Sequence, residues 1–344
     1  MKFVTAISAL ATLAAAAPSG SPSPLDIKLE MTDNNVVKAT VTNTGKDNLK
    51  VFKPNSIFDK APVEKVTISK DDKPVEFKGI RLRLSKSAAV EDAFQHIEAG
   101  KSVEVTFDVA ETHDLSQGGE FNIAAKGALQ YALEHDDTLI GAASSSASIT
   151  ASIDGAAAAA VQDNQNMRRT TFQRDCTGSR GQAVSNAANN CVSLSRQASR
   201  VASSGPASKM QEFFKSSSQQ VRSQVANVFD RVAAECPNNG GYSRTYCSDV
   251  GGYCGGNVLA YTVPSQSYIV YCDLYFNNLP PLTSACHRQD QATTNLHETT
   301  HLSEVAGTDD LGYGYDNIRR LSTQQSLNNA DSYAVFANSI YAGC

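Results

Sequence analysis

The sequence predicts two parts of different fold class: a β-rich, sandwich-like part over about residues 25–132, and a mostly helical α+β part over residues 170–344. Three observations lead to this prediction. Apolar residues alternate with polar ones in the first part, whereas in the second they recur every three or four residues. All eight cysteines lie in the second part, from Cys176 to Cys344.

The first 17 residues have the pattern of a secretory signal peptide. Lys2 is followed by an apolar run from Phe3 to Ala14 and by small residues before Pro18. The run is too short to span a bilayer, and no later stretch has the roughly 18 uncharged apolar residues that a membrane helix needs. We therefore expect a signal peptide at residues 1–17 and a secreted, extracellular product without a membrane anchor.

Four short runs in the next part alternate between apolar and polar residues, and turn residues separate them. Alternation of this kind is typical of strands with one buried face. The four runs span residues 36–41, 63–68, 80–84 and 103–107. Several strands at this spacing favour a small β-sandwich, and the part that contains them has no cysteine.

A low-complexity segment rich in Ala, Ser and Gly covers about residues 140–169 and has few large apolar side chains. Such a composition predicts an exposed linker. The segment ends with two arginines, and proteases cut preferentially in exposed, poorly packed backbone. We expect a processing protease to cut after Arg169, with Arg174 as the alternative site. Residues 18–169 would then form a propeptide, and the mature chain would begin at Thr170.

The second part is expected to be cross-linked by disulfides. An even number of cysteines in an exported segment favours four disulfides, and the sequence alone leaves their connectivity open. No C-x-x-C pair is present, so we expect structural cross-links rather than zinc ligands. The elements expected here are a helix over 180–202, a long amphipathic helix over 208–232, a hairpin of 258–263 with 268–272, a helix from near Asp290, and closing helices over 316–321 and 326–342.

The segment His297-Glu298-Thr299-Thr300-His301 carries the H-E-x-x-H pattern of zinc peptidases. On a helix, His297 and His301 lie one turn apart on the same face, so two imidazoles can bind one zinc ion while Glu298 lies beside it. The pattern also occurs by chance on exposed helices, so the third ligand decides the interpretation.

A catalytic zinc usually takes three protein ligands and leaves its fourth position to water. The position of a third histidine six residues after His301 is Gly307, and no glutamate follows Glu304. Glu304 lies too close to His301 on the same helix to turn back to the metal, so we expect it to face solvent or a neighbouring polar group. Gly307 is expected to end the helix, and the pair Asp309-Asp310 follows the turn.

Together with the later run Gly307-Thr308-Asp309-Asp310-Leu311-Gly312-Tyr313-Gly314, the H-E-x-x-H segment resembles the signature of the deuterolysin, or aspzincin, family of fungal secreted zinc metalloendopeptidases. The resemblance covers roughly residues 176–344 and implies a zincin-like metallopeptidase domain with one Zn2+ per chain. It implies zinc ligands His297, His301 and Asp310, Glu298 as general base, and Tyr313 as a hydroxyl that stabilises the transition state. It also implies the disulfides Cys176–Cys247, Cys254–Cys272 and Cys286–Cys344, which leaves Cys191 with Cys236.

Several of these residues have a structural alternative. Asp309 and Asp310 are also suited to cap a turn, and Tyr313 to be a half-buried aromatic residue. In the related fungal peptidyl-lysine endopeptidases, an aspartate at the position of Asp331 and a glutamate three residues later line the pocket for the side chain after the scissile bond. This sequence keeps Asp331 but has Ala334 at the second position, which implies a weaker preference for Lys or Arg. A surface or capping role is the alternative for Asp331.

The function expected from these residues is that of a secreted zinc metalloendopeptidase made as a zymogen, which acts as a monomer on protein and peptide substrates, basic ones above all. The alternatives are a secreted, disulfide-rich zinc-binding protein without turnover, and a structural zinc with four protein ligands. The chain has a formal charge of −5 and no basic stripe, so we expect no nucleic-acid partner.

The sequence leaves open how the zymogen is kept inactive. Folding assistance, blocking of the cleft, and capping of the zinc by a propeptide histidine (His96, His113 or His135) are all compatible with it, whereas a cysteine switch is excluded because the propeptide has no thiol. By analogy with other H-E-x-x-H peptidases, residues 268–276 could offer a strand edge to an extended substrate.

Overall fold

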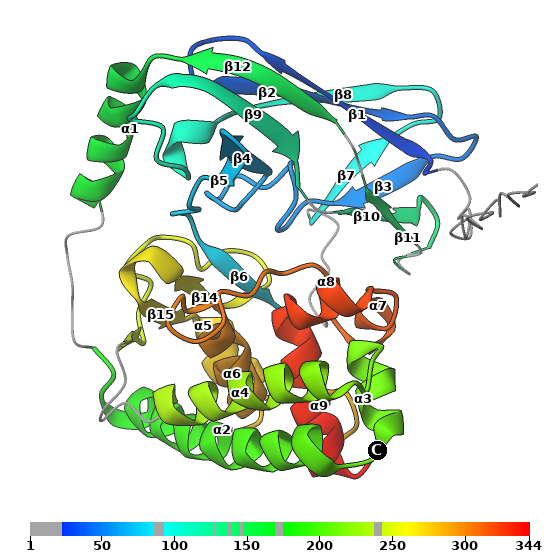
Figure 1. Ribbon diagram of the computed structural model, residues 1–344, viewed down its shortest axis with the longest axis vertical. Coiled ribbons are helices and arrows are strands. Elements are labelled where there is room, and N and C mark those ends of the chain that lie inside the picture. The colour runs from blue at the N-terminus through cyan, green and yellow to red at the C-terminus, as the bar shows by residue number, and fades with distance from the viewer. Residues whose placement is uncertain are drawn as a thin grey trace, which may run out of the picture.

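Two parts of the chain lie one above the other in the computed structural model, with the sheets of the N-terminal part over the helices of the C-terminal part (Figure 1). The structure describes residues 23–85, 93–126, 128–136, 139, 141–144, 147–168, 175–236 and 243–344. The expected signal peptide and the expected processing site after Arg169 lie outside these residues. Among the helices described, none is long and apolar enough to cross a membrane.

The N-terminal part is β-rich, as the sequence predicts, and its strands form three antiparallel sheets around one core. Alternation places Val37, Ala39 and Val41 in that core, where none of them is exposed. The sheets, with strands in spatial order, are β1 (Leu25–Met31), β2 (Val36–Asn43) and β8 (Ser102–Asp108); β11 (Gly141–Ser144), β10 (Ala128–Leu133), β3 (Leu49–Phe52) and β7 (Phe94–Ile97); β12 (Ser148–Ile153), β9 (Gly119–Ala125), β4 (Val66–Lys70) and β5 (Lys73–Pro74).

The low-complexity segment is ordered into strands and a helix, so the prediction of an exposed linker over residues 140–169 is wrong for most of its length. Strand β12 pairs with β9 along its whole length and buries Ala151 and Ile153. Helix α1 (Gly155–Arg168) follows, and Ala158 packs into the same core. A few apolar residues are enough to order this segment, because β12 adds to a sheet that other strands form. Helix α1 is favoured because alanine is the best helix former.

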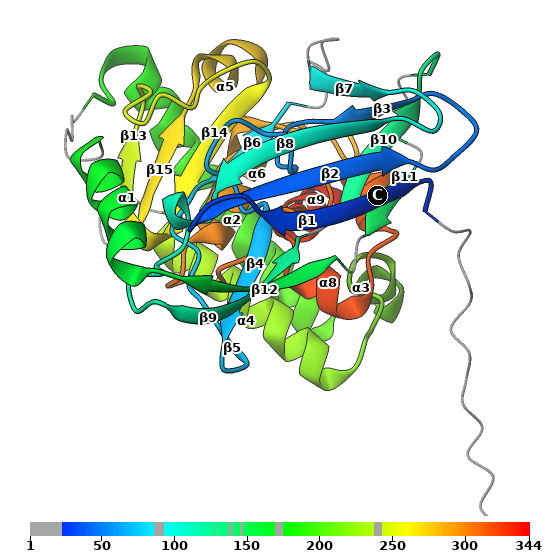
Figure 2. The same cartoon turned by 90° about the horizontal axis from the view of Figure 1, so that it is seen from above.

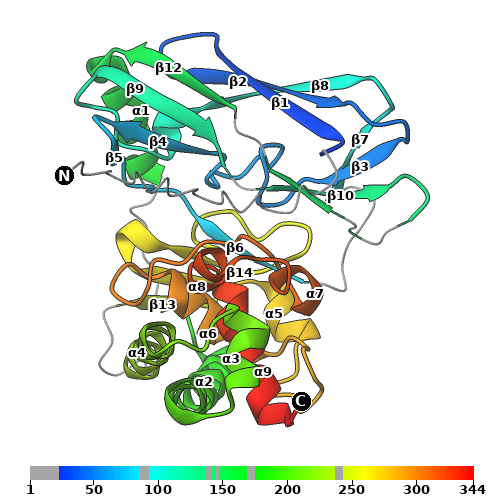
Figure 3. The same ribbon diagram turned by 45° about the vertical axis from the view of Figure 1, so that its right-hand side comes forward.

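The C-terminal part is a helical layer around a buried central helix, α6 (Gln291–His301), which contacts α2, α4 and α9 (Figure 3). Aromatic residues Phe213, Phe229 and Phe336 fill the core between these helices. The other helices are α2 (Gly178–Ser204), α3 (Ala207–Phe214), α4 (Gln219–Glu235), α5 (Asp273–Asn278), α7 (Tyr315–Ile318), α8 (Thr323–Leu327) and α9 (Ala330–Ala342).

The helix expected over residues 208–232 is in fact two helices. Lys215 ends α3 with a left-handed backbone conformation (φ 58°), and Ser218 begins α4 by accepting a hydrogen bond from the Val221 amide. The apolar spacing continues through the break because both helices bury their stripes in the same core. Periodicity alone therefore could not reveal the turn.

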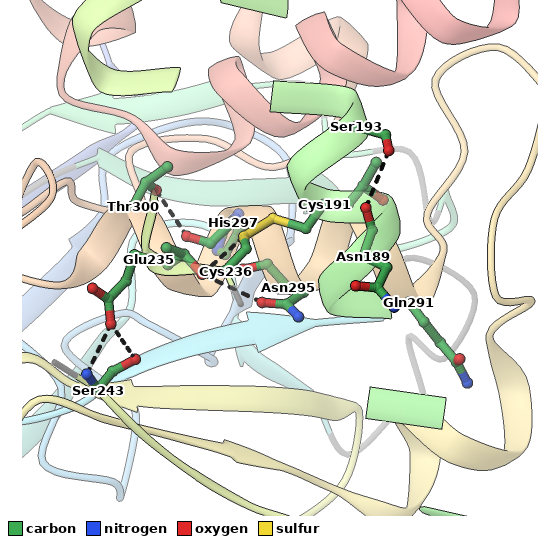
Figure 4. The surroundings of a disulfide bond; sticks show 12 residues. Asn189, Cys191, Ser193, Glu235, Cys236, Ser243, Gln291, Asn295, His297 and Thr300 are labelled. Carbon is green, nitrogen blue, oxygen red and sulfur yellow. Dashed lines mark hydrogen bonds between the residues drawn. A yellow bond between two sulfur atoms is a disulfide. The ribbon is translucent and has the colours of Figure 1, made fainter. Parts of the chain in front are cut away.

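All four disulfides are formed, and they are the pairs that the resemblance implies: Cys176–Cys247, Cys191–Cys236, Cys254–Cys272 and Cys286–Cys344. The second of these joins α2 to the end of α4 (Figure 4). The Cys236 sulfur lies 3.9 Å from the hydroxyl of Thr299 on α6. The central helix is thus covered on this side by a covalent cross-link.

A fourth sheet joins the two parts. Its order is β13 (Arg244–Tyr246), β15 (Tyr268–Tyr271), β14 (Val258–Val263) and β6 (Arg81–Leu84), so its last strand comes from the N-terminal part (Figure 2). The sequence predicts the strand at 80–84 correctly but assigns it to the N-terminal sandwich, which is wrong. The substrate edge proposed at residues 268–276 is also wrong, because β15 lies inside the sheet between β13 and β14.

Candidate metal centre

The central helix α6 is fixed at its first turn. Asp290 caps it by accepting a hydrogen bond from the Thr293 amide at 2.7 Å, and the Thr293 hydroxyl accepts one from the Asp290 amide. Every residue of the helix is buried, which is unusual for a segment with so many polar side chains. The polar side chains of α6 therefore make their contacts inside the protein.

His297 and His301 lie one turn apart on this helix, and neither side chain is exposed. Their Nε2 atoms are 3.1 Å apart. The helix ends at His301, not at Gly307 as expected, because the backbone of Leu302 leaves the helical region (ψ 134°) and buries its side chain. The chain then turns through Gly307 (φ +59°), so that the Thr308 carbonyl accepts a hydrogen bond from His301 Nδ1 at 2.7 Å. This bond leaves Nε2 free for a metal.

Asp310 completes a triangle of ligand atoms. Its Oδ1 lies 3.1 Å from His297 Nε2 and its Oδ2 lies 3.4 Å from His301 Nε2. Asn329 holds the loop in place, since its Oδ1 accepts hydrogen bonds from the amides of Leu311 and Gly312. Two imidazoles and one carboxylate, all within 4.8 Å of one another, are a donor set that zinc prefers.

The Asp310 carboxylate is a buried anionic group that suits a cation. The side chain is 5% exposed, and neither oxygen has a hydrogen-bond partner among the described residues. Burial acts to raise the pKa of this carboxyl, but His301 and His297 outweigh burial and hold the pKa below its usual value. Burial lowers the pKa of His301 to about 4, which keeps its imidazole neutral, as a metal ligand must be. The residues therefore fit a zinc ion.

Glu298 lies beside the ligands and is held by a residue that the sequence did not reveal. The Thr262 hydroxyl, on β14, donates a hydrogen bond to Glu298 Oε2 at 2.6 Å, and Glu298 Oε1 has no partner in the part of the chain that the structure describes. Burial raises the pKa of Glu298 to about 7. One oxygen is thus anchored and the other is available to exchange a proton.

Tyr313 also faces the centre, and its ring stacks at 6.1 Å from the His297 ring. Burial raises the pKa of its hydroxyl well above the usual value, so the group remains a donor. The hydroxyl donates to the Leu82 carbonyl oxygen and accepts from the Asn55 amide. Both of these partners belong to the N-terminal part.

Asp331, at the start of α9, is fully buried beside His297. One oxygen accepts a hydrogen bond from the Gly314 amide at 2.5 Å, and the other forms an ion pair with Arg83 of β6. The latter oxygen is also 3.4 Å from His297 Nδ1. A surface role for Asp331 is therefore excluded, because the buried carboxylate faces the Arg83 guanidinium and the His297 imidazole.

Asp309, the neighbour of Asp310, faces the N-terminal part. Its carboxylate lies 2.6 Å from Arg81 and 2.9 Å from Lys126. Neither His96 nor His113 reaches the centre: His96 pairs with Glu134, and His113 packs against Phe77. These two histidines do not cap the metal position.

The resemblance found in the C-terminal part extends over the whole chain. The model of the deuterolysin metalloprotease (M35) family matches residues 1–344. A neutral protease 2 homolog of Colletotrichum graminicola is 46% identical over 100% of both chains, and neutral protease 2 of Aspergillus oryzae is 43% identical over 99% of this chain and 98% of its own. A solved zinc peptidase from Grifola frondosa is 20% identical with a TM-score of 0.39, over 48% of this chain and 97% of its own. The chain belongs to the deuterolysin metalloprotease (M35) family.

Proposed function

We propose that this metalloprotease is secreted as an inactive precursor and cuts peptide bonds next to basic residues, with one zinc ion held by His297, His301 and Asp310. The observation that carries the proposal is the ligand triangle, in which a buried carboxylate without hydrogen bonds faces two imidazole nitrogens. Zinc, when bound, supplies a Lewis acid that makes water acidic enough to lose a proton near neutral pH.

Glu298 has the position and the proton affinity of a general base. Its free oxygen accepts the proton of the attacking water and then passes it to the leaving amine. The Tyr313 hydroxyl, which burial keeps protonated, donates to the peptide carbonyl oxygen as negative charge develops there. A protein that binds zinc without turnover requires neither the Glu298 carboxylate nor the Tyr313 hydroxyl at these positions.

Asp331 supports the preference for basic residues, since it already holds a guanidinium group in a buried site. We infer that the side chain of Lys or Arg after the scissile bond takes this place in a substrate. Residues 18–169 would act as the propeptide, with cleavage after Arg169 giving a mature chain from Thr170.

The test is the variant Glu298→Gln in the processed protein. We expect it to bind zinc as the parent does and to lose peptide cleavage by at least about 100-fold, because a general base typically contributes about 100- to 10,000-fold. Metal analysis and the cleavage rate of a quenched fluorescent peptide measure the two properties. Cleavage at the parent rate would remove Glu298 from the mechanism.

A further inference from the structure

We propose that strand β6 is a built-in inhibitor that fills the peptide-binding cleft as a substrate would, with the Leu82–Arg83 peptide bond in the place of the scissile bond. The proposal rests on the proposed peptidase function and concerns the regulation of the same site. Three contacts of β6 support it: the pairing of its backbone with β14, a contact of the Leu82 carbonyl oxygen, and a contact of the Arg83 side chain.

The backbone contact is strand addition. Strand β6 pairs antiparallel with β14, with Leu82 opposite Tyr261 and Arg81 opposite Thr262. Thr262 is the residue that anchors Glu298, so β6 runs directly alongside the proposed general base. Adding a strand to a sheet edge is a common way to hold an extended peptide. While β6 is bound, β14 is paired on both sides and has no edge to offer a substrate.

The carbonyl contact places Leu82 at the catalytic hydroxyl. Tyr313, the proposed donor to the scissile carbonyl oxygen, donates to the Leu82 carbonyl oxygen instead. Asn55, from another loop of the N-terminal part, donates its side-chain amide to the same hydroxyl. A second carbonyl oxygen would have to displace both groups to reach Tyr313.

The side-chain contact places Arg83 at the pocket for a basic residue. Arg83 directly follows the Leu82 carbonyl, as the side chain after a scissile bond would, and its guanidinium meets the Asp331 carboxylate with 1% and 0% of the two side chains exposed. Its Nη1 is also 2.7 Å from Nδ1 of the ligand His297. The carbonyl and the side chain are therefore both in the register that the proposed mechanism requires of a substrate.

A second ion cluster holds β6 from its other end. Arg81 pairs with Asp309, and Glu64 bridges Arg81 and Lys126, so that two acids of the C-terminal part are each paired with an arginine of β6. The cavity that Asp310 and Tyr313 line together has a volume of about 40 Å³, which admits a water molecule or two but no peptide. A larger cavity of about 580 Å³ borders Tyr313 but not Asp310.

Assistance in folding alone would not require these contacts. Among the described residues, the main core of the C-terminal part consists of residues from that part, which also contains all four disulfides. The N-terminal part meets the C-terminal part in a smaller apolar cluster around Leu82 and Tyr261 and at the groups that the proposed mechanism uses. Blocking of the cleft is therefore the form of latency that the contacts favour.

The experiment measures binding rather than turnover. A fluorescent peptide with Leu-Arg at its centre is titrated into zinc-loaded Glu298→Gln protein, which cannot cut it, before and after cleavage behind Arg169 and removal of the N-terminal part. We expect the unprocessed chain to bind the peptide at least about 10-fold more weakly. Arg83→Ala and the milder Arg83→Gln should raise the affinity of the unprocessed chain. Lys38→Ala, on the central strand β2 of another sheet and paired with Glu30, should leave it unchanged.

Equal affinity before and after processing would overturn the proposal, as would the absence of peptide binding in both forms or an Arg83 variant that binds no better than Lys38→Ala. Thermal unfolding of each variant shows whether it is folded. If the processed wild-type protein binds the peptide but never cuts it, the peptidase function fails while the inhibitory role of β6 stands.

Discussion

Arg83 and Asp331 form an ion pair between the two parts of the chain, and at most 1% of either side chain is exposed to solvent. The guanidinium and the carboxylate come from positions 248 residues apart, on β6 and α9. Removing one partner of such a buried pair typically costs about 3–5 kcal/mol, because the other charge is left unpaired. The N-terminal part should therefore remain bound for some time after the connecting segment is cut.

The first prediction concerns substrate preference. In the processed enzyme, Asp331→Asn should lower kcat/KM about 10- to 100-fold for peptides with Lys or Arg after the scissile bond, since a hydrogen bond to a charged group contributes about 1.5–3 kcal/mol. Peptides with a neutral residue there should be cut nearly as before, because asparagine still accepts the bond from the Gly314 amide. Steady-state kinetics on matched peptides measure this, and an equal loss on all of them would make Asp331 purely structural.

Thr262 is expected to position Glu298 rather than to react. Thr262→Val removes the hydroxyl that holds Glu298 Oε2 but keeps the shape of the side chain. We expect kcat to fall about 5- to 10-fold with KM and zinc content unchanged, because one hydrogen bond contributes about 1 kcal/mol. Thr262→Ser should restore the rate. If serine fails to rescue it, the methyl group and its packing matter rather than the hydrogen bond.

The register of β6 predicts a cleavage site. A synthetic peptide with the sequence of residues 78–87 should be cut by the processed enzyme chiefly between Leu82 and Arg83, as measured by mass spectrometry of the fragments. Replacing Arg81 by Gln in the peptide should keep this cut, and replacing Arg83 by Gln should weaken it about 10-fold or more. A main cut before Arg81 would mean that β6 does not lie in the register of a substrate.

The ion cluster that Glu64 forms with Arg81 and Lys126 should become less stable in acid. Burial opposes ionisation of Glu64, but Arg81 and Lys126 outweigh it and lower the pKa of this carboxyl to about 2 from 4.5. A carboxyl whose pKa is lowered by folding stabilises the protein above its unfolded pKa, so this stability is lost as the pH falls from about 4.5 to about 2. Thermal unfolding of the full chain should show the loss, and Glu64→Gln should flatten it in that window. If the stability of this variant falls with pH as steeply as that of the parent, other groups cause the acid lability.

Much of the metal centre could be predicted from the sequence because its spacing is local. His297, Glu298 and His301 lie within one helical turn and a half, so the helix alone brings them together. Asp310 lies only nine positions after His301, and the family resemblance of the loop motif that contains it implies its role. Asp331 was identified by resemblance, but its burial beside His297 depends on how α9 packs against α6.

The contacts between distant segments could not be predicted. The alternation at residues 80–84 predicted a strand, but a period of two does not say which strand lies beside it. The sequence does not distinguish Thr262 from other strand residues, because its contact with Glu298 depends on how β14 packs against α6. The ends of helices failed for a related reason: the break after Phe214 and the early end at His301 depend on local backbone conformations that the apolar pattern does not record.

The most direct test of the zinc centre is to remove the metal from the processed enzyme with a chelator and to add zinc back in steps while peptide cleavage is followed. We expect cleavage to vanish with the metal and to return in proportion to the zinc added, reaching its full rate at one ion per chain, whereas Asp310→Ala should recover no activity under the same titration. Full activity in protein from which zinc has been removed would contradict the assignment of His297, His301 and Asp310 as the ligands of a catalytic metal.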